Sequence, residues 1–184
     1  MSNDSNIPDD RHCFRIMEQW NMLPHIRRHS IMVSRVALCI AEALNASGAD
    51  FNLAEIQAAS LLHDITKTKS IQSGENHAVS GARLIAGLGY PEIADIILQH
   101  INPHDGGEHI TAGEIVSYAD KRVLHEEVVN LDARFAYLLE RYGKSTDALR
   151  RIDDSRRRAQ AIEEKIIAHI TLPGFNIHCL PLEA

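Results

Sequence analysis

Apolar residues recur at intervals of three and four positions along most of the chain, with polar residues between them. This spacing is typical of helices that bury one face, and no segment shows the alternation of a half-buried strand. The pattern predicts helices over residues 10–22, 24–47, 52–64, 77–88, 91–100, 111–123, 130–142 and 146–169. The polar segment 70–76 is expected to be a loop. These expectations define an all-α fold class.

Residue types at the expected helix ends support these boundaries. Pro24 stands at the first position of its helix, where the missing amide proton leaves no hydrogen bond unmade. Asn52 and Glu55 have the spacing of a capping box, and Thr111 and Glu114 repeat it. These residues predict the starts of the helices at 24, 52 and 111, and Pro91 gives the same signal for the helix at 91.

A chain of 184 residues is long enough for one well-buried core. Apolar residues make up 45% and charged residues 24%, which is the profile of a folded helical protein. We expect a single domain over residues 1–184, a helical bundle whose core covers about 24–124. C-terminal helices over 130–170 are expected to pack on that core.

Net charge, the lengths of apolar stretches and the spacing of cysteines indicate which partners and which compartment to expect. A formal net charge of -6 argues against bulk nucleic acid, because phosphate backbones are bound by clustered Lys and Arg. Residues 1–10 are polar and acidic, unlike a secretory signal, and no apolar stretch approaches the ~18 to 20 residues that span a bilayer. Cys13, Cys39 and Cys179 lack CxxC spacing, so no disulfide framework is expected. A cytoplasmic protein without a membrane partner is predicted, with its oligomeric state left open.

Histidines and aspartates on apolar helical faces are the most informative residues. The chain has eleven histidines, and some of them end apolar stripes where a solvated surface needs no imidazole. An aspartate on such a face requires a partner, since an unpaired buried carboxylate is strongly unfavourable. The candidate metal ligands on these grounds are His29, His63, Asp64, His77, His100 and Asp120.

The adjacent pair His63 and Asp64 lies at the centre of this set. Successive helical residues are rotated by about 100°, so Asp64 either joins His63 on one ion or reaches a second one. The remaining candidates are far apart in the sequence, which excludes a local finger-type site. A site built from inward-facing side chains of several helices is the arrangement this spacing favours.

The ordered set resembles the HD-domain metal-dependent phosphohydrolases. Residues 61–67, Leu-Leu-His-Asp-Ile-Thr-Lys, are similar to that family's Leu-Leu-His-Asp-Ile-Gly-Lys segment, with Thr66 where the family usually has Gly. The resemblance covers about residues 24–124 and implies an HD-domain helical bundle with a metal site in its core. The segments around His77, His100 and Asp120 look most like branches with a two-metal centre, such as the bacterial diadenosine tetraphosphate hydrolases and, more distantly, the HD-GYP phosphodiesterases. The GYP signature itself is absent.

This resemblance implies a ligand set and a reaction. The first metal would be held by His29, His63, Asp64 and Asp120. Asp64 would bridge to a second metal held by His77 and His100. The cofactors would be two divalent ions, with iron or manganese favoured by the mixed nitrogen and oxygen ligands and Mg, Co, Ni or Zn left open. The implied reaction is hydrolysis of a phosphoester or phosphoanhydride bond of a small nucleotide by a metal-activated hydroxide.

Further residues near these positions are candidates for substrate contacts. Lys67 resembles the family's lysine and is predicted to act with Asp64 in catalysis, through a phosphate or a ligand carboxylate. Lys121, Arg122 and the loop residue His104 are predicted to bind the substrate. For Lys121 and Arg122 the alternative is an ordinary charged helix face. For Lys67 the alternative is a lysine that faces solvent.

Other functions remain open at this stage. A mononuclear nucleotidase or cyclic-nucleotide phosphodiesterase would need only His29, His63, Asp64 and Asp120. A nucleotide-sensing module would keep the fold without turnover. A purely structural helical protein would tolerate the loss of His63 and Asp64 without any effect of metal.

Overall fold

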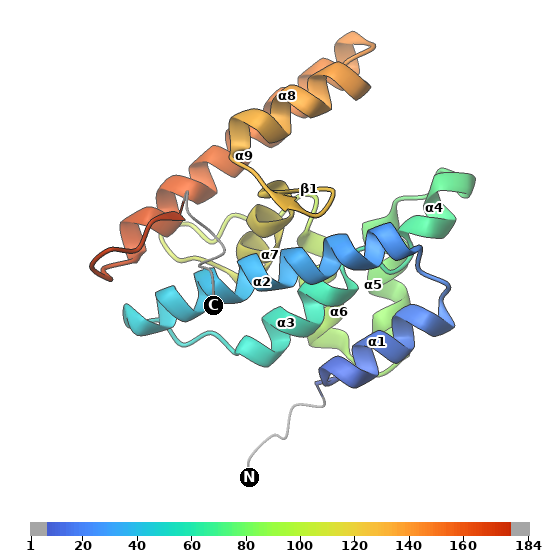
Figure 1. Cartoon of the computed structure of the whole chain (residues 1–184), viewed down its shortest axis with the longest axis horizontal. Helices are drawn as coiled ribbons and strands as arrows, with labels where there is room; N and C mark the ends of the chain where they lie inside the picture. Colours follow the sequence, from blue (N-terminus) through green and yellow to red (C-terminus); the bar gives the residue numbers. More distant parts are fainter. Residues whose placement is uncertain (1–6, 178–184) are drawn as a thin grey trace.

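The computed structural model describes residues 7–177, and most of this part of the chain is helical (Figure 1). The helices are α1 (Asp10–Gln19), α2 (Pro24–Ala46), α3 (Leu53–Leu62), α4 (Lys67–Ser73), α5 (His77–Gly87), α6 (Pro91–Gln99), α7 (Ala112–Lys121), α8 (Leu131–Tyr142) and α9 (Thr146–His169). A small antiparallel pair, β1 (Val123–Leu124) and β2 (Glu127–Val128), lies between α7 and α8. The all-α class is confirmed.

Capping residues begin the helices where the sequence indicates. Pro24 is the first residue of α2. Thr111 and Glu114 form a complete capping box at the start of α7. The Asn52 side chain accepts hydrogen bonds from the backbone of α3, but Glu55 accepts from the Asn52 side-chain amide. That helix is therefore capped by Asn52 without the reciprocal backbone bond of a capping box.

Two short elements were not predicted. The segment expected to be a loop over 70–76 belongs largely to α4, which buries none of its residues and so has no apolar stripe in the sequence. Gly74 ends this helix with φ +74°, a conformation that glycine adopts without strain. The strands of the β1–β2 hairpin have two residues each, too few to show an alternating pattern.

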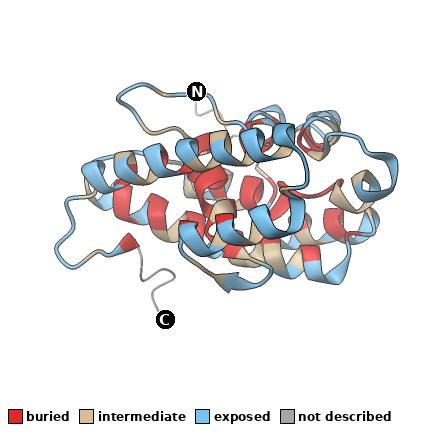
Figure 2. Ribbon diagram, turned by 90° about the horizontal axis from the view of Figure 1, so that it is seen from above, coloured by how far each residue is buried: buried red, intermediate tan, exposed pale blue. Residues whose placement is uncertain are grey.

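The long helix α2 organises the centre of the fold by packing against α3 and α7, while α6 packs against α3, α5 and α7 (Figure 1). Buried residues concentrate where these helices face one another (Figure 2). A Cβ on Gly81 of α5 would lie 3.4 Å from Ile65 and 3.6 Å from Ile97. These are ordinary van der Waals distances, so α5 packs directly against the chain that follows α3 and against α6.

The last two helices form an antiparallel pair that extends beyond the rest of the molecule (Figure 1). Ala159, Ile162 and Ile166 of α9 are buried, and α9 packs against α7 and α2. The C-terminal part of the chain therefore covers one side of α7. Cys179, for which no disulfide is expected, lies outside the described residues.

None of the helices within residues 7–177 combines the length and the apolar character needed to cross a membrane.

Candidate metal centre

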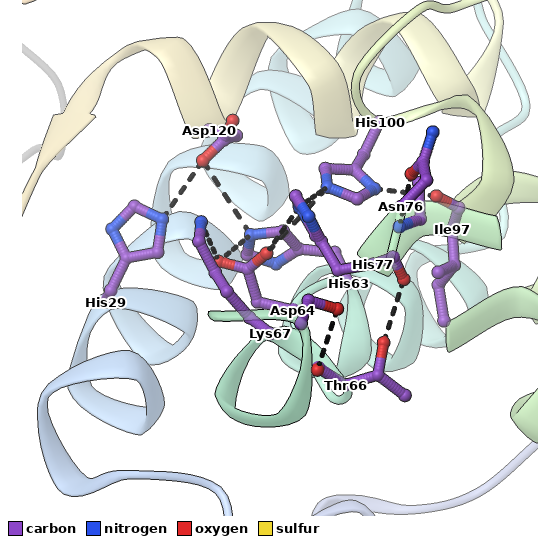
Figure 3. Close-up of polar contacts among 12 residues, drawn as sticks. His29, His63, Asp64, Thr66, Lys67, Asn76, His77, Ile97, His100 and Asp120 are labelled. Carbon is purple, nitrogen blue, oxygen red and sulfur yellow. Dashed lines mark hydrogen bonds and ion pairs between the residues drawn. The ribbon is translucent and has the colours of Figure 1, made fainter. Parts of the chain in front are cut away.

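Six side chains from five segments of the chain point toward one another in the core (Figure 3). They are His29 of α2, His63 and Asp64 after the end of α3, His77 at the start of α5, His100 after α6 and Asp120 of α7. His63, Asp64 and His100 have side chains at most 2% exposed. The structure thus brings together every residue that the sequence proposed as a metal ligand.

Four of these residues form a first group. The Nε2 atom of His29 lies 3.0 Å from Oδ1 of Asp120, and the Nε2 atom of His63 lies 3.7 Å from the same oxygen. His63 Nε2 also lies 3.4 Å from Oδ2 of Asp64. Two imidazole nitrogens and two carboxylates therefore face a common point.

Asp64 also belongs to a second group. Its Oδ1 atom lies 3.2 Å from Nε2 of His77 and 3.8 Å from Nε2 of His100, and the two nitrogens are 3.2 Å apart. The two oxygens of one carboxylate therefore face different sets of histidines. The Asp64 carboxylate is thus shared by two groups of side chains, each of which could hold a metal ion.

Backbone carbonyls fix the orientation of three histidine rings through their Nδ1 atoms. The contacts are His29 Nδ1 to the His125 carbonyl at 2.9 Å, His63 Nδ1 to Ser60 at 2.7 Å and His100 Nδ1 to Ile97 at 2.7 Å. A carbonyl only accepts, so each Nδ1 carries the proton and donates it. A neutral ring then presents the Nε2 lone pair to the centre, as a metal ligand must.

The polar atoms at the centre fit divalent metal ions. His63 Nε2 and Asp64 Oδ1 are buried and have no hydrogen-bond partner within residues 7–177, one in each group. Such atoms are unfavourable unless something binds them. Two imidazole nitrogens at about 2.1 Å from one ion would be roughly 3 Å apart, which agrees with the separation of His77 and His100.

The electrostatics of the metal-free protein differ between the two groups. Burial opposes the charged form of His63, but the Asp64 carboxylate outweighs it and raises the pKa of the imidazole to about 9. Burial also opposes ionisation of Asp64, yet His63 and Lys67 hold the pKa of its carboxyl well below the ordinary value. Burial lowers the pKa of His100 to about 3. His63 in the first group therefore holds a proton at neutral pH where a metal would bind, whereas His100 in the second group is uncharged.

This difference predicts how the stability of the metal-free protein depends on pH. The folded pKa of His63 lies above the unfolded value of 6.5, so its contribution is complete below pH 6.5 and is lost as the pH rises toward about 9. We expect the free energy of unfolding of the chelator-treated protein, measured by urea titration, to fall across this interval. The metal-loaded protein should gain stability over the same interval, because metal binding displaces the proton.

The control for this measurement is His25→Gln, which changes an exposed histidine of α2. It should show the same decline as the wild type. A metal-free protein whose stability is constant from pH 6.5 to 9 would contradict the prediction.

Two lysines neutralise the carboxylates from the outer side. Lys67 Nζ lies 2.7 Å from Asp64 Oδ2, and Lys121 Nζ lies 2.7 Å from Asp120 Oδ2. The Lys67 side chain is 38% exposed, against 12% for Lys121. Lys67 thus contacts the carboxylate of a candidate metal ligand, which was one of its two predicted roles. Both ammonium groups lie beside candidate ligands. Their contact with substrate stays a prediction.

Arg122 does not point toward the site, and this corrects its predicted role as a substrate ligand. Its side chain is 1% exposed, and the guanidinium donates to the carbonyls of Val129 and Ile177 and to the Tyr118 hydroxyl. These hydrogen bonds hold Val129, which follows the hairpin, and Ile177 against the C-terminal end of α7. His104 lies on an exposed loop, and no contact with the six residues is found for its side chain in the described part of the chain.

Two supporting residues were missed in the sequence. His125 has φ +57° and offers its carbonyl to His29, a role that depends on backbone conformation and leaves no residue signature. Thr66, at the position where a glycine was expected, donates a hydrogen bond of 2.9 Å to the His77 carbonyl. The threonine at a position that is usually glycine in the family was the sequence feature that could have indicated this hydrogen bond to His77.

Comparison with known proteins now assigns the fold. The family model described as the HD domain matches residues 26–170, a span that contains all six residues of the centre. The chain belongs to the HD domain family. Within it, this HD domain is similar to a solved structure described as a predicted HD superfamily hydrolase from an uncultured Thermotogales bacterium, at 21% identity and a TM-score of 0.50, covering 89% of this chain and 94% of that one. At 21% identity, this similarity shows a shared fold and nothing about activity. No curated protein matches the sequence.

Proposed function

We propose that this HD domain is a metal-dependent phosphohydrolase with two divalent ions. The observation that carries the proposal is the buried Asp64 carboxylate, whose two oxygens face two separate sets of histidine nitrogens. Nitrogen and oxygen donors without a thiolate favour iron or manganese. The solved neighbour bears the description of a hydrolase, which is compatible with this proposal.

The six residues of the centre would act as ligands to two ions. The first ion would be held by His29, His63, Asp64 and Asp120, and the second by Asp64, His77 and His100. When bound, the ions would lower the pKa of a water molecule and stabilise negative charge on a phosphoryl group. Four neutral imidazoles and two carboxylates leave such a pair with about two net positive charges, which attracts a phosphate.

The exposure of the ligands indicates where a substrate would approach. His77 is 22% exposed and Lys67 is 38% exposed, whereas His63, Asp64 and His100 are nearly inaccessible. A phosphate would therefore reach the centre past His77 and Lys67. The Lys67 ammonium, already next to Asp64, is positioned to donate to an incoming oxygen. The substrate class that we propose is a small nucleotide with an accessible phosphoester or phosphoanhydride bond.

An activity screen tests the proposal. Protein loaded with manganese or ferrous iron would be incubated with nucleoside mono-, di- and triphosphates, cyclic nucleotides, dinucleoside polyphosphates and p-nitrophenyl phosphate. We expect phosphate release or anhydride cleavage from at least one class. Chelation should lower the rate by at least about a hundred-fold, because charge stabilisation at phosphorus depends on the ions.

The same screen separates the alternatives. Turnover limited to cyclic nucleotides or nucleoside monophosphates, with one ion per chain, would support the mononuclear enzymes. Tight binding of one nucleotide with no turnover of any substrate would contradict the proposal and support a sensing module. A matched Asp50→Asn variant, at an exposed position before α3, should behave as the wild type.

A further inference from the structure

His77 is held differently from the other three histidines of the centre. Backbone carbonyls bond to the Nδ1 atoms of His29, His63 and His100 at 2.7 to 2.9 Å. No hydrogen bond to the Nδ1 atom of His77 is found among residues 7–177, and the polar contacts of its ring are those of Nε2 with Asp64 and His100. Its side chain is also the most exposed of the four. The position of this candidate ligand therefore depends on the backbone that carries it.

Thr66 ties that backbone to the segment that contains Asp64. The Thr66 hydroxyl donates to the His77 carbonyl at 2.9 Å (Figure 3). A carbonyl oxygen has two lone pairs, so it can accept this bond in addition to the backbone bond of α5. Thr66 follows Asp64 by two residues and is buried. One hydroxyl thus joins the chain beside the shared carboxylate to a histidine of the second group.

Two further contacts hold Thr66 against the first turns of α5. The Ser80 Oγ atom lies 2.8 Å from Thr66 Oγ1, and Ser80 is the donor because the one Thr66 proton goes to His77. A Cβ on Gly81 would lie 3.5 Å from Thr66 Oγ1, so the hydroxyl packs directly on this helix. Thr66 therefore accepts one hydrogen bond from α5 and donates another to it.

These bonds are the principal polar connection between residues 63–66 and α5. The other connection found between them in the described chain is the contact of Asp64 with His77 itself, at 3.2 Å. In the metal-free protein, the spacing of these two candidate ligands thus depends largely on the Thr66 hydroxyl. An outer partner that orients a ligand raises metal affinity, because the ligand is already ordered when the ion binds.

We propose that Thr66 is a positioning residue for the second ion, and that its hydroxyl holds His77 where one cation can bind both His77 and Asp64. This inference rests on the two ions of the proposed function and names a residue outside the ligand set that determines the affinity of one of them. The family usually has Gly at this position, and glycine has no hydroxyl. The tie between Thr66 and His77 is therefore a departure of this chain from the usual segment.

Titration of the metal-free protein with Mn²⁺ tests this role. Free Mn²⁺, measured by electron paramagnetic resonance, gives the dissociation constant of each site, and His77→Ala identifies the second one. Thr66→Val removes the hydroxyl and keeps the shape. We expect it to weaken the second site by about ten-fold, the loss typical for an outer partner of a metal ligand, and the first by less than about two-fold. Thr66→Ser keeps the hydroxyl and should retain wild-type affinity at both sites.

Ser47→Ala is the matched control. The Ser47 hydroxyl donates to the Ala43 carbonyl at 2.9 Å and accepts from the Thr171 amide at 2.9 Å, so it makes the same two kinds of bond as Thr66. It follows the end of α2, about 27 Å along the helix axis from His29. We expect this variant to lower the melting temperature of the metal-free protein and to leave both dissociation constants unchanged.

A second background separates positioning from a general structural role. In His77→Ala, Thr66→Val should have no further effect on the remaining site, because Thr66 acts through His77. Thr66→Ala also lacks the hydroxyl and should weaken the second site as Thr66→Val does, so the test does not depend on whether valine fits beside the carbonyl. Wild-type affinity in both variants, or equal weakening of the two sites, would overturn the proposal.

This inference and the proposed function fail in different ways. Metal affinities that respond to Thr66 as expected, in a protein that hydrolyses none of the substrates screened, would leave the positioning role standing and refute the phosphohydrolase. Turnover with two bound ions, together with wild-type affinities in Thr66→Val and Thr66→Ala, would refute only the role of Thr66. A wild type that binds one ion, with an affinity unchanged in His77→Ala, would overturn the role of Thr66 and leave hydrolysis by one ion to the activity screen.

Discussion

Replacing Asp64 by asparagine is expected to lower kcat/KM on the best substrate by at least about a thousand-fold, because several kcal/mol of charge stabilisation at phosphorus would be lost with the ions. Asparagine has nearly the same shape, but it offers one oxygen and one N–H₂ donor. One of the two histidine groups would then face a donor in place of an anionic ligand. The measurement is steady-state kinetics with elemental analysis of protein purified without chelator.

The expected metal content makes this test specific. Since both groups use Asp64, the variant should retain less than one tightly bound ion in total. Asp50→Asn, an isosteric change at an exposed carboxylate, should retain wild-type metal and rate. An Asp64→Asn protein with full metal content and more than about a tenth of the activity would show that this carboxylate is no bridging ligand.

The parts of the fold and site that were predictable depend on patterns intrinsic to the sequence. Helices that bury an apolar stripe leave a periodic signal, as in α2, which begins at Pro24, and α7, which follows its N-cap Thr111. The ligands were predictable because a histidine or an aspartate at the end of an apolar stripe, as with His100, is buried unfavourably unless a partner such as a metal ion binds it. Their order then matched a known family.

The missed features depend on tertiary structure. A carbonyl such as that of His125 becomes a partner of His29 only after the hairpin has folded against α2. The direction of Arg122 depends on the later chain, because its guanidinium bonds to the carbonyl of Val129, seven residues on, and to that of Ile177, 55 residues on.

The Asp64 bridge also makes the two groups separable by mutation. His77→Ala is expected to leave one tightly bound ion per chain where the wild type has two, because the His77 Nε2 atom lies beside Asp64 Oδ1 and His100 Nε2, which belong to the second group. His29→Ala should remove the other ion, since His29 pairs with Asp120 in the first group. Inductively coupled plasma mass spectrometry of dialysed protein gives the stoichiometry.

The turnover rate should fall when the second ion is lost. We expect His77→Ala to reduce kcat by at least about a hundred-fold, because one cation alone neutralises less of the charge that develops at phosphorus. His77 is the most exposed of the four histidines that contribute Nε2 atoms, so its removal should disturb the core least. His109→Ala, at an exposed loop position, provides the matched control. One ion in the wild type, with full activity in His77→Ala, would replace the two-metal mechanism by the mononuclear one, since His29, His63, Asp64 and Asp120 would then suffice.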